Sequence, residues 1–259
     1  MNIIHSFVLG VVEGVTEFLP ISSTAHLIIT SKLLGITQTE FIKFFEVFIQ
    51  SGAILAVIFI YFSYVVKHKD LWLKIAISFI PTAIVGLILE KTITKYFFNS
   101  LRLIEVAMFG VGILFIVFEW MIKKGKIRLS KSIQEMNHWE AFLIGVGQSL
   151  AVVPGVSRAG IVMLTMMGQG FKRSESAIYS FILAIPTIFA ASTLDFFKTD
   201  FKLLTNNSNL QFLLIGFFTS FVFAYIFVKW LIGYLKKYTL VTFGLYRIIL
   251  TIILLLFLR

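Results

Sequence analysis

The stretch that decides the fold covers residues 10–26 and reads GVVEGVTEFLPISSTAH. It lies inside an apolar segment, residues 1–34, which Pro20 and the polar run after it interrupt. Proline ends a helix because its ring clashes with the carbonyl four residues earlier, and serine and threonine favour the start of a new helix. The stretch therefore predicts one helix before Pro20, a break, and a second short helix after it.

A second broken segment covers residues 139–168 and contains the stretch GVGQSLAVVPGVSRAG at residues 145–160. The same spacing of 134 residues separates Pro20 from Pro154, and Ser23 from Ser157. This similarity is weak at each position but keeps one offset along most of each half. It predicts an internal repeat, a common way to build membrane transport and lipid-handling folds.

The rest of the chain consists of apolar spans separated by charged loops. Hydrophobic residues make up 58% of the chain and charged residues 14%, with a mean hydropathy of +0.94. This composition excludes a soluble enzyme and a disordered chain. Each broken segment precedes three segments long enough to cross a bilayer, at residues 41–66, 71–89 and 101–122 in the first half and at 176–197, 211–234 and 239–258 in the second.

We therefore expect an all-α integral membrane protein, one membrane domain over residues 1–259. Its two repeats are residues 1–122 and 139–259, joined by a basic cytoplasmic loop at 123–138. Three spans are an odd number, so the second half enters from the opposite face and the repeat has inverted topology. The positive-inside rule agrees with this orientation. Two re-entrant breaks would then meet near the midplane.

Charge and cysteine content narrow the function classes further. The chain has no cysteine, which excludes disulfides, Fe–S clusters and Cys–Zn sites. The net charge is +10. In a membrane protein, basic loops set the orientation and contact anionic lipid head groups, so we expect membrane lipids and not nucleic acid as partners.

Two carboxylates lie on one helical face of the first broken segment. Glu13 and Glu17 are four residues apart, and neither has a basic neighbour within its own segment. Ionisable residues inside a membrane are costly and mark functional sites. A shared divalent cation or a shared proton would relieve their repulsion.

Hydroxyl and imidazole groups follow directly after the same break. Ser22, Ser23 and Thr24 are suited to capping the next helix, and His26 lies one turn further along. Hydroxyls, an imidazole and carboxylates in one short segment also resemble the equipment of acid–base or nucleophilic catalysis. For Ser22 and Thr24 a capping role and a functional role are equally supported, whereas Ser23 is favoured by its match to Ser157.

The second break carries the elements of an anion site. Gly155 permits a sharp turn, and Ser157 and Arg158 begin the next helix. Free N–H groups at a helix start, a hydroxyl and a guanidinium together suit phosphate. The two breaks thus predict a membrane site for a phosphate-bearing lipid, without deciding between cleaving that lipid and moving it.

At these residues the sequence resembles the undecaprenyl-diphosphate phosphatase family, also called the bacitracin-resistance family. The stretch from Glu13 to His26 is similar to the family's first motif, and the one from Pro154 to Arg158 to its second. The resemblance covers the whole chain. It implies hydrolysis of undecaprenyl diphosphate to the monophosphate and inorganic phosphate, which recycles the lipid carrier for cell-wall synthesis. It also implies a bacterial cytoplasmic membrane location with a site that faces the outer side.

Residue roles follow from the motif match alone. The resemblance implies that Glu13 and Glu17 hold a divalent cation, Mg²⁺ or Ca²⁺, and take part in acid–base chemistry. Ser23 is a candidate nucleophile with His26 beside it, and Arg158 holds the diphosphate. The nucleophile stays open between Ser23, His26 and water. Ser22, Thr24, Gly155 and Ser157 complete the expected substrate-binding set.

Two positions depart from the family pattern. Ala159 and Val162 stand where the family carries a serine and a threonine, so two hydroxyls are missing from the phosphate side. The competing hypothesis is a transporter or flippase for a polyprenyl-phosphate lipid without hydrolysis, because inverted repeats with midplane breaks are transporter architecture. A homodimer is left open.

Overall fold

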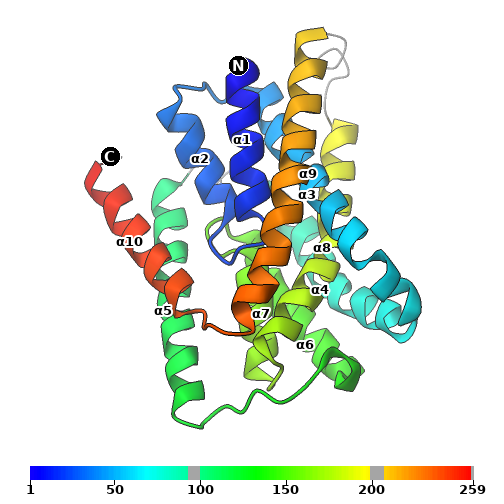
Figure 1. Cartoon of the computed structure of the whole chain (residues 1–259). Coiled ribbons are helices and arrows are strands. Elements are labelled where there is room, and N and C mark those ends of the chain that lie inside the picture. The colour runs from blue at the N-terminus through cyan, green and yellow to red at the C-terminus, as the bar shows by residue number, and fades with distance from the viewer. Residues whose placement is uncertain (93–99, 199–206, 258–259) are drawn as a thin grey trace.

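The computed structural model describes residues 1–92, 100–198 and 207–257, and within these ranges helices joined by loops make up the fold, with one isolated bridge between Lys131 and Phe171. Five α-helices form the first half (Figure 1): α1 (Ile3–Thr16), α2 (Ser23–Leu33), α3 (Glu40–Lys67), α4 (Asp70–Thr92) and α5 (Leu101–Lys123). Five more form the second half: α6 (His138–Ser149), α7 (Arg158–Gly168), α8 (Arg173–Lys198), α9 (Asn207–Leu235) and α10 (Val241–Phe257). The predicted all-α fold is confirmed over the described residues.

Both predicted breaks are present. Helix α1 ends at Thr16, four residues before Pro20, where the proline ring would clash with a helical carbonyl. Ser22 then caps α2 by accepting the N–H of Ala25, and Ser157 caps α7 by accepting the N–H of Gly160. The capping residue of α2 is thus Ser22, one position before the serine that the repeat spacing pairs with Ser157.

The two capping serines share a strained backbone. Ser22 has a φ of 74° and Ser157 a φ of 72°, and they are the two non-glycine residues with positive φ among those described. Such conformations cost of order 1–3 kcal/mol and concentrate at functional sites. The chain therefore stores the same local strain at both breaks.

The long helices are those of a multi-pass membrane protein. Among the described residues, five are long and apolar enough to cross a bilayer: α3, α4 over Asp70–Leu89, α5, α8 and α9. The sixth predicted span, residues 239–258, contains the shorter helix α10 of 17 residues. Large apolar side chains point outward from these helices, as on a lipid-facing surface; examples are Phe59, Ile88, Phe197 and Ile249.

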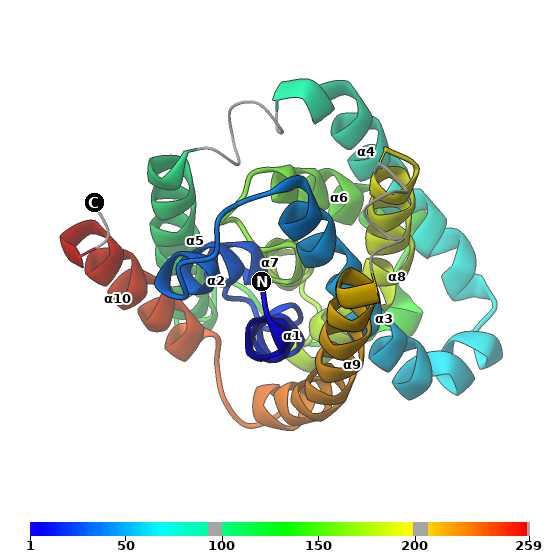
Figure 2. The same ribbon diagram turned by 90° about the horizontal axis from the view of Figure 1, so that it is seen from above.

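One short helix from each break, α1 and α7, lies between the other helices (Figure 2). Viewed from above (Figure 2), α1 and α7 lie near the centre, with α3, α5, α6, α8 and α9 around them. Helix α1 packs on α9 and α3, α6 packs on α4, and α10 packs on α5. Helices α1 and α2 lie towards the end of the molecule that carries the N-terminus, whereas α6 and α7 lie towards the opposite end (Figure 1).

Close packing of the broken segments relies on glycine. A Cβ atom on Gly10 would come within 2.7 Å of the carbonyl of Gly216 in α9, and one on Gly145 within 2.4 Å of the carbonyl of Ser78 in α4. Small residues let helix backbones approach in this way inside a membrane. Both broken segments are thereby held against a long helix of the other half.

Candidate active site

The carboxylate of Glu17 connects the two breaks. Its Oε2 accepts a hydrogen bond from Ser23 Oγ at 2.5 Å, and its Oε1 accepts one from Arg158 Nη2 at 2.6 Å. Glu17 lies just after α1, whereas Arg158 is the first residue of α7. The side chains of Glu17 and Arg158 are only 8% and 10% exposed. Residues that lie 141 positions apart in the chain therefore form one buried polar cluster.

Three contacts fix the guanidinium of Arg158. Besides Glu17, it donates from Nη1 to the carbonyl of Ser180 in α8 at 2.9 Å. Its Cζ lies 5.7 Å from the ring centre of Phe18, a cation–π contact. Arg158 thus begins α7 with a largely buried side chain that donates to protein groups.

Glu13 differs from Glu17 in that no donor group bonds to its carboxylate in the described structure. Its side chain is fully buried, and neither of its carboxylate oxygens has a hydrogen-bond partner in the described structure. The charged groups that act on it are Glu17, Glu46 and Arg158. A buried ionised carboxylate without a partner is costly, so Glu13 requires a proton or a cation.

This unsatisfied carboxylate bears on the predicted metal. No group of three or more acidic or histidine side chains suited to a metal lies within the described ranges. The pair Glu13 and Glu17 still fits Mg²⁺, because this cation is typically held by one or two carboxylates together with water and substrate phosphate oxygens. The donor set suits a cation that binds together with a phosphorylated substrate better than a closed protein cage.

The imidazole of His26 does not contact Ser23. Its Nδ1 lies 2.7 Å from the carbonyl of Ser22, and its Nε2 lies 2.7 Å from the hydroxyl of Tyr246 in α10. A carbonyl can only accept, so Nδ1 carries a proton. In the neutral ring Nε2 then accepts from Tyr246. Thr24 is half-buried in the same first turn of α2.

Gly155 can only be glycine in this structure. Its φ is 97°, and a Cβ atom there would come within 2.5 Å of the carbonyl of Ile104 in α5. The absence of a side chain lets the second break lie directly against α5. Ser157 follows as the cap of α7 and orients the helix start that carries Arg158.

The two positions at which the sequence departs from the family pattern lie in apolar surroundings. Ala159 is 1% exposed within the largest core cluster, and Val162 is fully buried in a second cluster. Their side chains pack among hydrophobic neighbours, which include Phe115 for the first cluster and Phe171 for the second. An apolar side chain at either position therefore packs well against its neighbours, and no hydroxyl is needed there.

Two residues of α10, Tyr246 and Arg247, contact the site but were not predicted from the sequence. Arg247 is fully buried and donates to backbone carbonyls of both breaks. Tyr246 holds His26. The signal that could have found Arg247 is the rule applied to Arg158, that a charged residue inside an apolar span marks a functional site.

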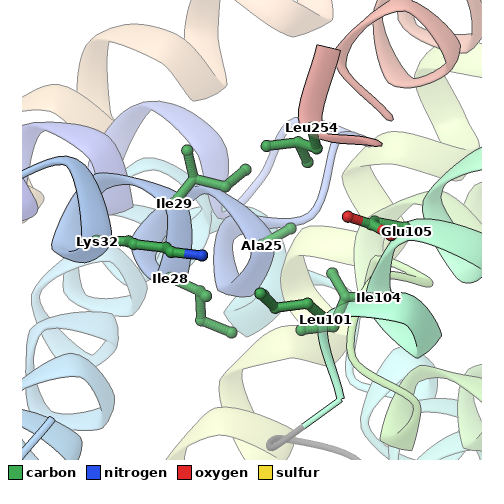
Figure 3. Close-up of a pocket in the computed structure, with 8 residues that line it drawn as sticks. All are labelled: Ala25, Ile28, Ile29, Lys32, Leu101, Ile104, Glu105 and Leu254. Carbon is green, nitrogen blue, oxygen red and sulfur yellow. The ribbon is translucent and has the colours of Figure 1, made fainter. Parts of the chain in front are cut away.

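A small, mostly apolar pocket lies between α2, α5 and α10. Figure 3 shows its walls, in which α2 faces α5 and α10. Ala25, two residues after Ser23, is one of its lining residues. Lys32 and Glu105 are its two charged side chains, and the remaining lining residues are Ile28, Ile29, Leu101, Ile104 and Leu254. An apolar surface thus begins one turn or less along α2 from Ser23.

Fold and site together define a class, that of multi-pass helical membrane proteins with a buried carboxylate–arginine–serine cluster where two broken helices meet. Residues 6–253 match the family described as bacitracin resistance protein BacA. The chain belongs to this family.

Individual relatives agree over nearly their whole length. The chain is 46% identical over 257 residues to a protein of Persephonella marina named undecaprenyl-diphosphatase, covering 99% of both chains. Proteins with the same name from Campylobacter fetus and Wolinella succinogenes are each 42% identical, over 96% of both chains for the first and over 100% of this chain and 99% of its relative for the second. The resemblance read from the two motifs is confirmed.

Proposed function

We propose that this protein hydrolyses undecaprenyl diphosphate to undecaprenyl phosphate and inorganic phosphate. The observation that carries the proposal is the Ser23–Glu17–Arg158 cluster, which sets a hydroxyl, a carboxylate and a guanidinium together at the breaks of a membrane protein. The names of its full-length relatives support cleavage of the lipid over transport without hydrolysis.

Each member of the cluster has a chemical role in this proposal. Glu17 accepts the proton of Ser23, whose oxygen attacks the terminal phosphorus while the bond to the leaving lipid monophosphate breaks. Water then hydrolyses the phosphoserine and releases phosphate. In the alternative route, water attacks directly and Ser23 only orients the phosphate. Arg158 neutralises the diphosphate with its planar fork of donors.

Around this cluster, Ser22 and Ser157 hold the two helix starts, and Thr24 and Gly155 shape the phosphate side. His26, whose Nδ1 carries a proton, is available for proton exchange through Tyr246. Glu13 and Glu17 would hold Mg²⁺ or Ca²⁺, which when bound neutralises phosphate charge. The unsatisfied oxygens of Glu13 support this cation.

The architecture supports an inverted repeat of residues 1–122 and 139–259 within one membrane domain. Equivalent helices make equivalent contacts across the two halves. Helix α1 of the first half packs on α9 of the second, and α6, the counterpart of α1, packs on α4, the counterpart of α9. Helices α3 and α8 pack on each other, as do α5 and α10. We place residues 123–138 in the bacterial cytoplasm and the opening of the site on the outer face of the cytoplasmic membrane. The basic residues of that loop support this orientation.

The test is phosphate release from undecaprenyl diphosphate by the purified protein in detergent, with and without a chelator. We expect release that the chelator abolishes and that added Mg²⁺ or Ca²⁺ restores. A folded protein that releases no phosphate but moves the lipid between the leaflets of a vesicle would overturn the proposal in favour of transport. Phosphate release that does not depend on the chelator would contradict the proposed cation requirement but not the proposed hydrolysis.

A further inference from the structure

Arg247 is the one fully buried arginine among the described residues. Its guanidinium donates to backbone carbonyls on three separate pieces of chain. The acceptors are Pro20 at 3.2 Å in the first break, Gly155 and, at 3.3 Å, Val156 in the second break, and Met108 at 3.1 Å in α5. Its Cζ also lies 5.8 Å from the ring centre of Phe115.

This set of partners is unusual for a buried charge. None of the ion pairs found in the described ranges includes Arg247, so carbonyl dipoles provide its hydrogen-bonding environment. A guanidinium presents its N–H donors in a fixed plane. Moving either break away would leave buried donors unsatisfied, which is costly in a low-dielectric interior.

The clamped carbonyls lie next to the proposed reacting groups. Pro20 lies between Glu17 and Ser23, and Gly155 and Val156 lie just before Ser157 and Arg158. The contacts of Glu17 with Ser23 at 2.5 Å and with Arg158 at 2.6 Å require the two breaks to keep one relative position. Arg247 contacts the backbone of both breaks.

We propose that Arg247 is a positioning residue, which holds the two breaks together so that Ser23 and Arg158 both reach Glu17. Helix α10, which carries it, packs on α5, the helix against which Gly155 lies. Displacements well below a helical turn suffice to slow a reaction that depends on aligned groups. This role rests on the proposed phosphatase function and adds to it a residue that does not touch the substrate.

The test compares Arg247→Lys with a matched control. Lysine keeps the charge but replaces the planar fork with a single ammonium group, which cannot contact both breaks in the same way. We expect kcat for phosphate release to fall roughly 10- to 150-fold, as for the loss of one charge-assisted hydrogen bond. We expect KM to change less.

The control is Arg173→Lys. Arg173 is a partly buried arginine that donates through Nε and Nη2 to Glu119, whereas its hydrogen bonds reach neither break. Both variants are assayed at a temperature at which thermal unfolding scans show them folded. Equal losses of kcat in the two variants at matched stability, or wild-type kcat in Arg247→Lys, would overturn the positioning role.

A second readout does not depend on activity. Spin labels at Ile29→Cys in α2 and Leu150→Cys in the second break report the distance between the two broken segments, and the chain has no other cysteine. We expect one narrow distance distribution in the otherwise unchanged protein and with Arg173→Lys, and a broader or shifted one with Arg247→Lys. An unchanged distance distribution in Arg247→Lys would contradict the positioning role of Arg247, even in a protein that released no phosphate. Failure of this inference can therefore be distinguished from failure of the proposed function.

Discussion

The two carboxylates of the first broken helix have different surroundings, although the sequence presents them as an equivalent pair. Glu17 has a partner on each oxygen, and Glu13 has none in the described structure. A carboxylate that accepts from two donors orients those neighbours. A buried carboxylate without donors is costly to keep charged, so it favours binding a cation or a proton. The pair therefore combines an ordered member with a member that is costly to leave charged.

Replacing either carboxylate by glutamine should separate these roles. We expect both Glu13→Gln and Glu17→Gln to lower turnover by about 100-fold or more while the proteins still insert, because each loses the charge that would hold a cation. Thermal unfolding should then distinguish them. Glu17→Gln lowers the Tm by leaving Arg158 without its counter-ion, whereas Glu13→Gln maintains or raises it. Near-normal activity and unchanged metal dependence in both variants would refute the carboxylate site.

Ser23 decides the chemical route. If its oxygen attacks phosphorus, Ser23→Ala nearly abolishes turnover, and acid quenching of the wild-type reaction traps a phosphoserine detectable by mass spectrometry. If water attacks and Ser23 only binds phosphate, the loss is that of one hydrogen bond to a charged group, about 1.5–3 kcal/mol or roughly 10- to 150-fold. An unchanged rate would remove Ser23 from the site altogether.

At the residue scale, the sequence indicated which polar residues come together at the two breaks, but not all of their contacts. Glu17, Ser23 and Arg158 were predicted because charged and hydroxyl groups at helix breaks have few purely structural uses. The contact of His26 with Tyr246 spans 220 positions, and no local spacing encodes it. Arg247 lies in an otherwise regular apolar span, where its partners are backbone carbonyls that no side-chain motif reveals.

At the scale of elements, the breaks could be predicted and the helix packing could not. Proline and serine specify locally where helices end and begin, so α1, α2, α6 and α7 follow from the sequence. Which long helix each broken segment packs on depends on tertiary contacts. The contacts of α1 with α9 and of α6 with α4 use glycines that have no distinctive local pattern.

A glycine contact gives the corresponding test. A Cβ atom on Gly52 in α3 would come within 2.3 Å of the carbonyl of Phe217 in α9. Gly52→Ala should therefore destabilise the protein by roughly 1–3 kcal/mol, the usual cost of overpacking. Gly110→Ala in α5 is the control, because no neighbouring atom lies within 4 Å of the added Cβ. A drop in Tm for Gly110→Ala as large as that for Gly52→Ala would show that close α3–α9 packing is not the cause.

At the scale of the whole molecule, the orientation in the membrane can be checked without an activity assay. Lys126 is exposed in the basic loop, and Thr37 is exposed between α2 and α3. These two segments lie at opposite ends of the molecule (Figure 1). In intact cells an impermeant thiol reagent should label Thr37→Cys and leave Lys126→Cys unlabelled. The reverse pattern would invert the orientation and place the site opening in the cytoplasm.

The central claim for the whole molecule is that two halves distant in sequence form one hydrolytic site. Arg158 is the residue through which the second half reaches Glu17 of the first. If its guanidinium also clamps the diphosphate, a lysine cannot replace it, because an ammonium is a point charge without the planar fork. If Arg158 only balances the carboxylate, lysine should serve almost as well.

The rate of phosphate release from undecaprenyl diphosphate by Arg158→Lys therefore tests the account most directly, measured against the unchanged protein in the same detergent and at the same metal concentration. We predict a folded protein that loses most of its turnover, roughly 10- to 150-fold for the loss of one charge-assisted contact. Arg158→Ala should lose more. Wild-type turnover in Arg158→Lys would contradict the account, and Arg158 would then be a structural counter-ion of Glu17.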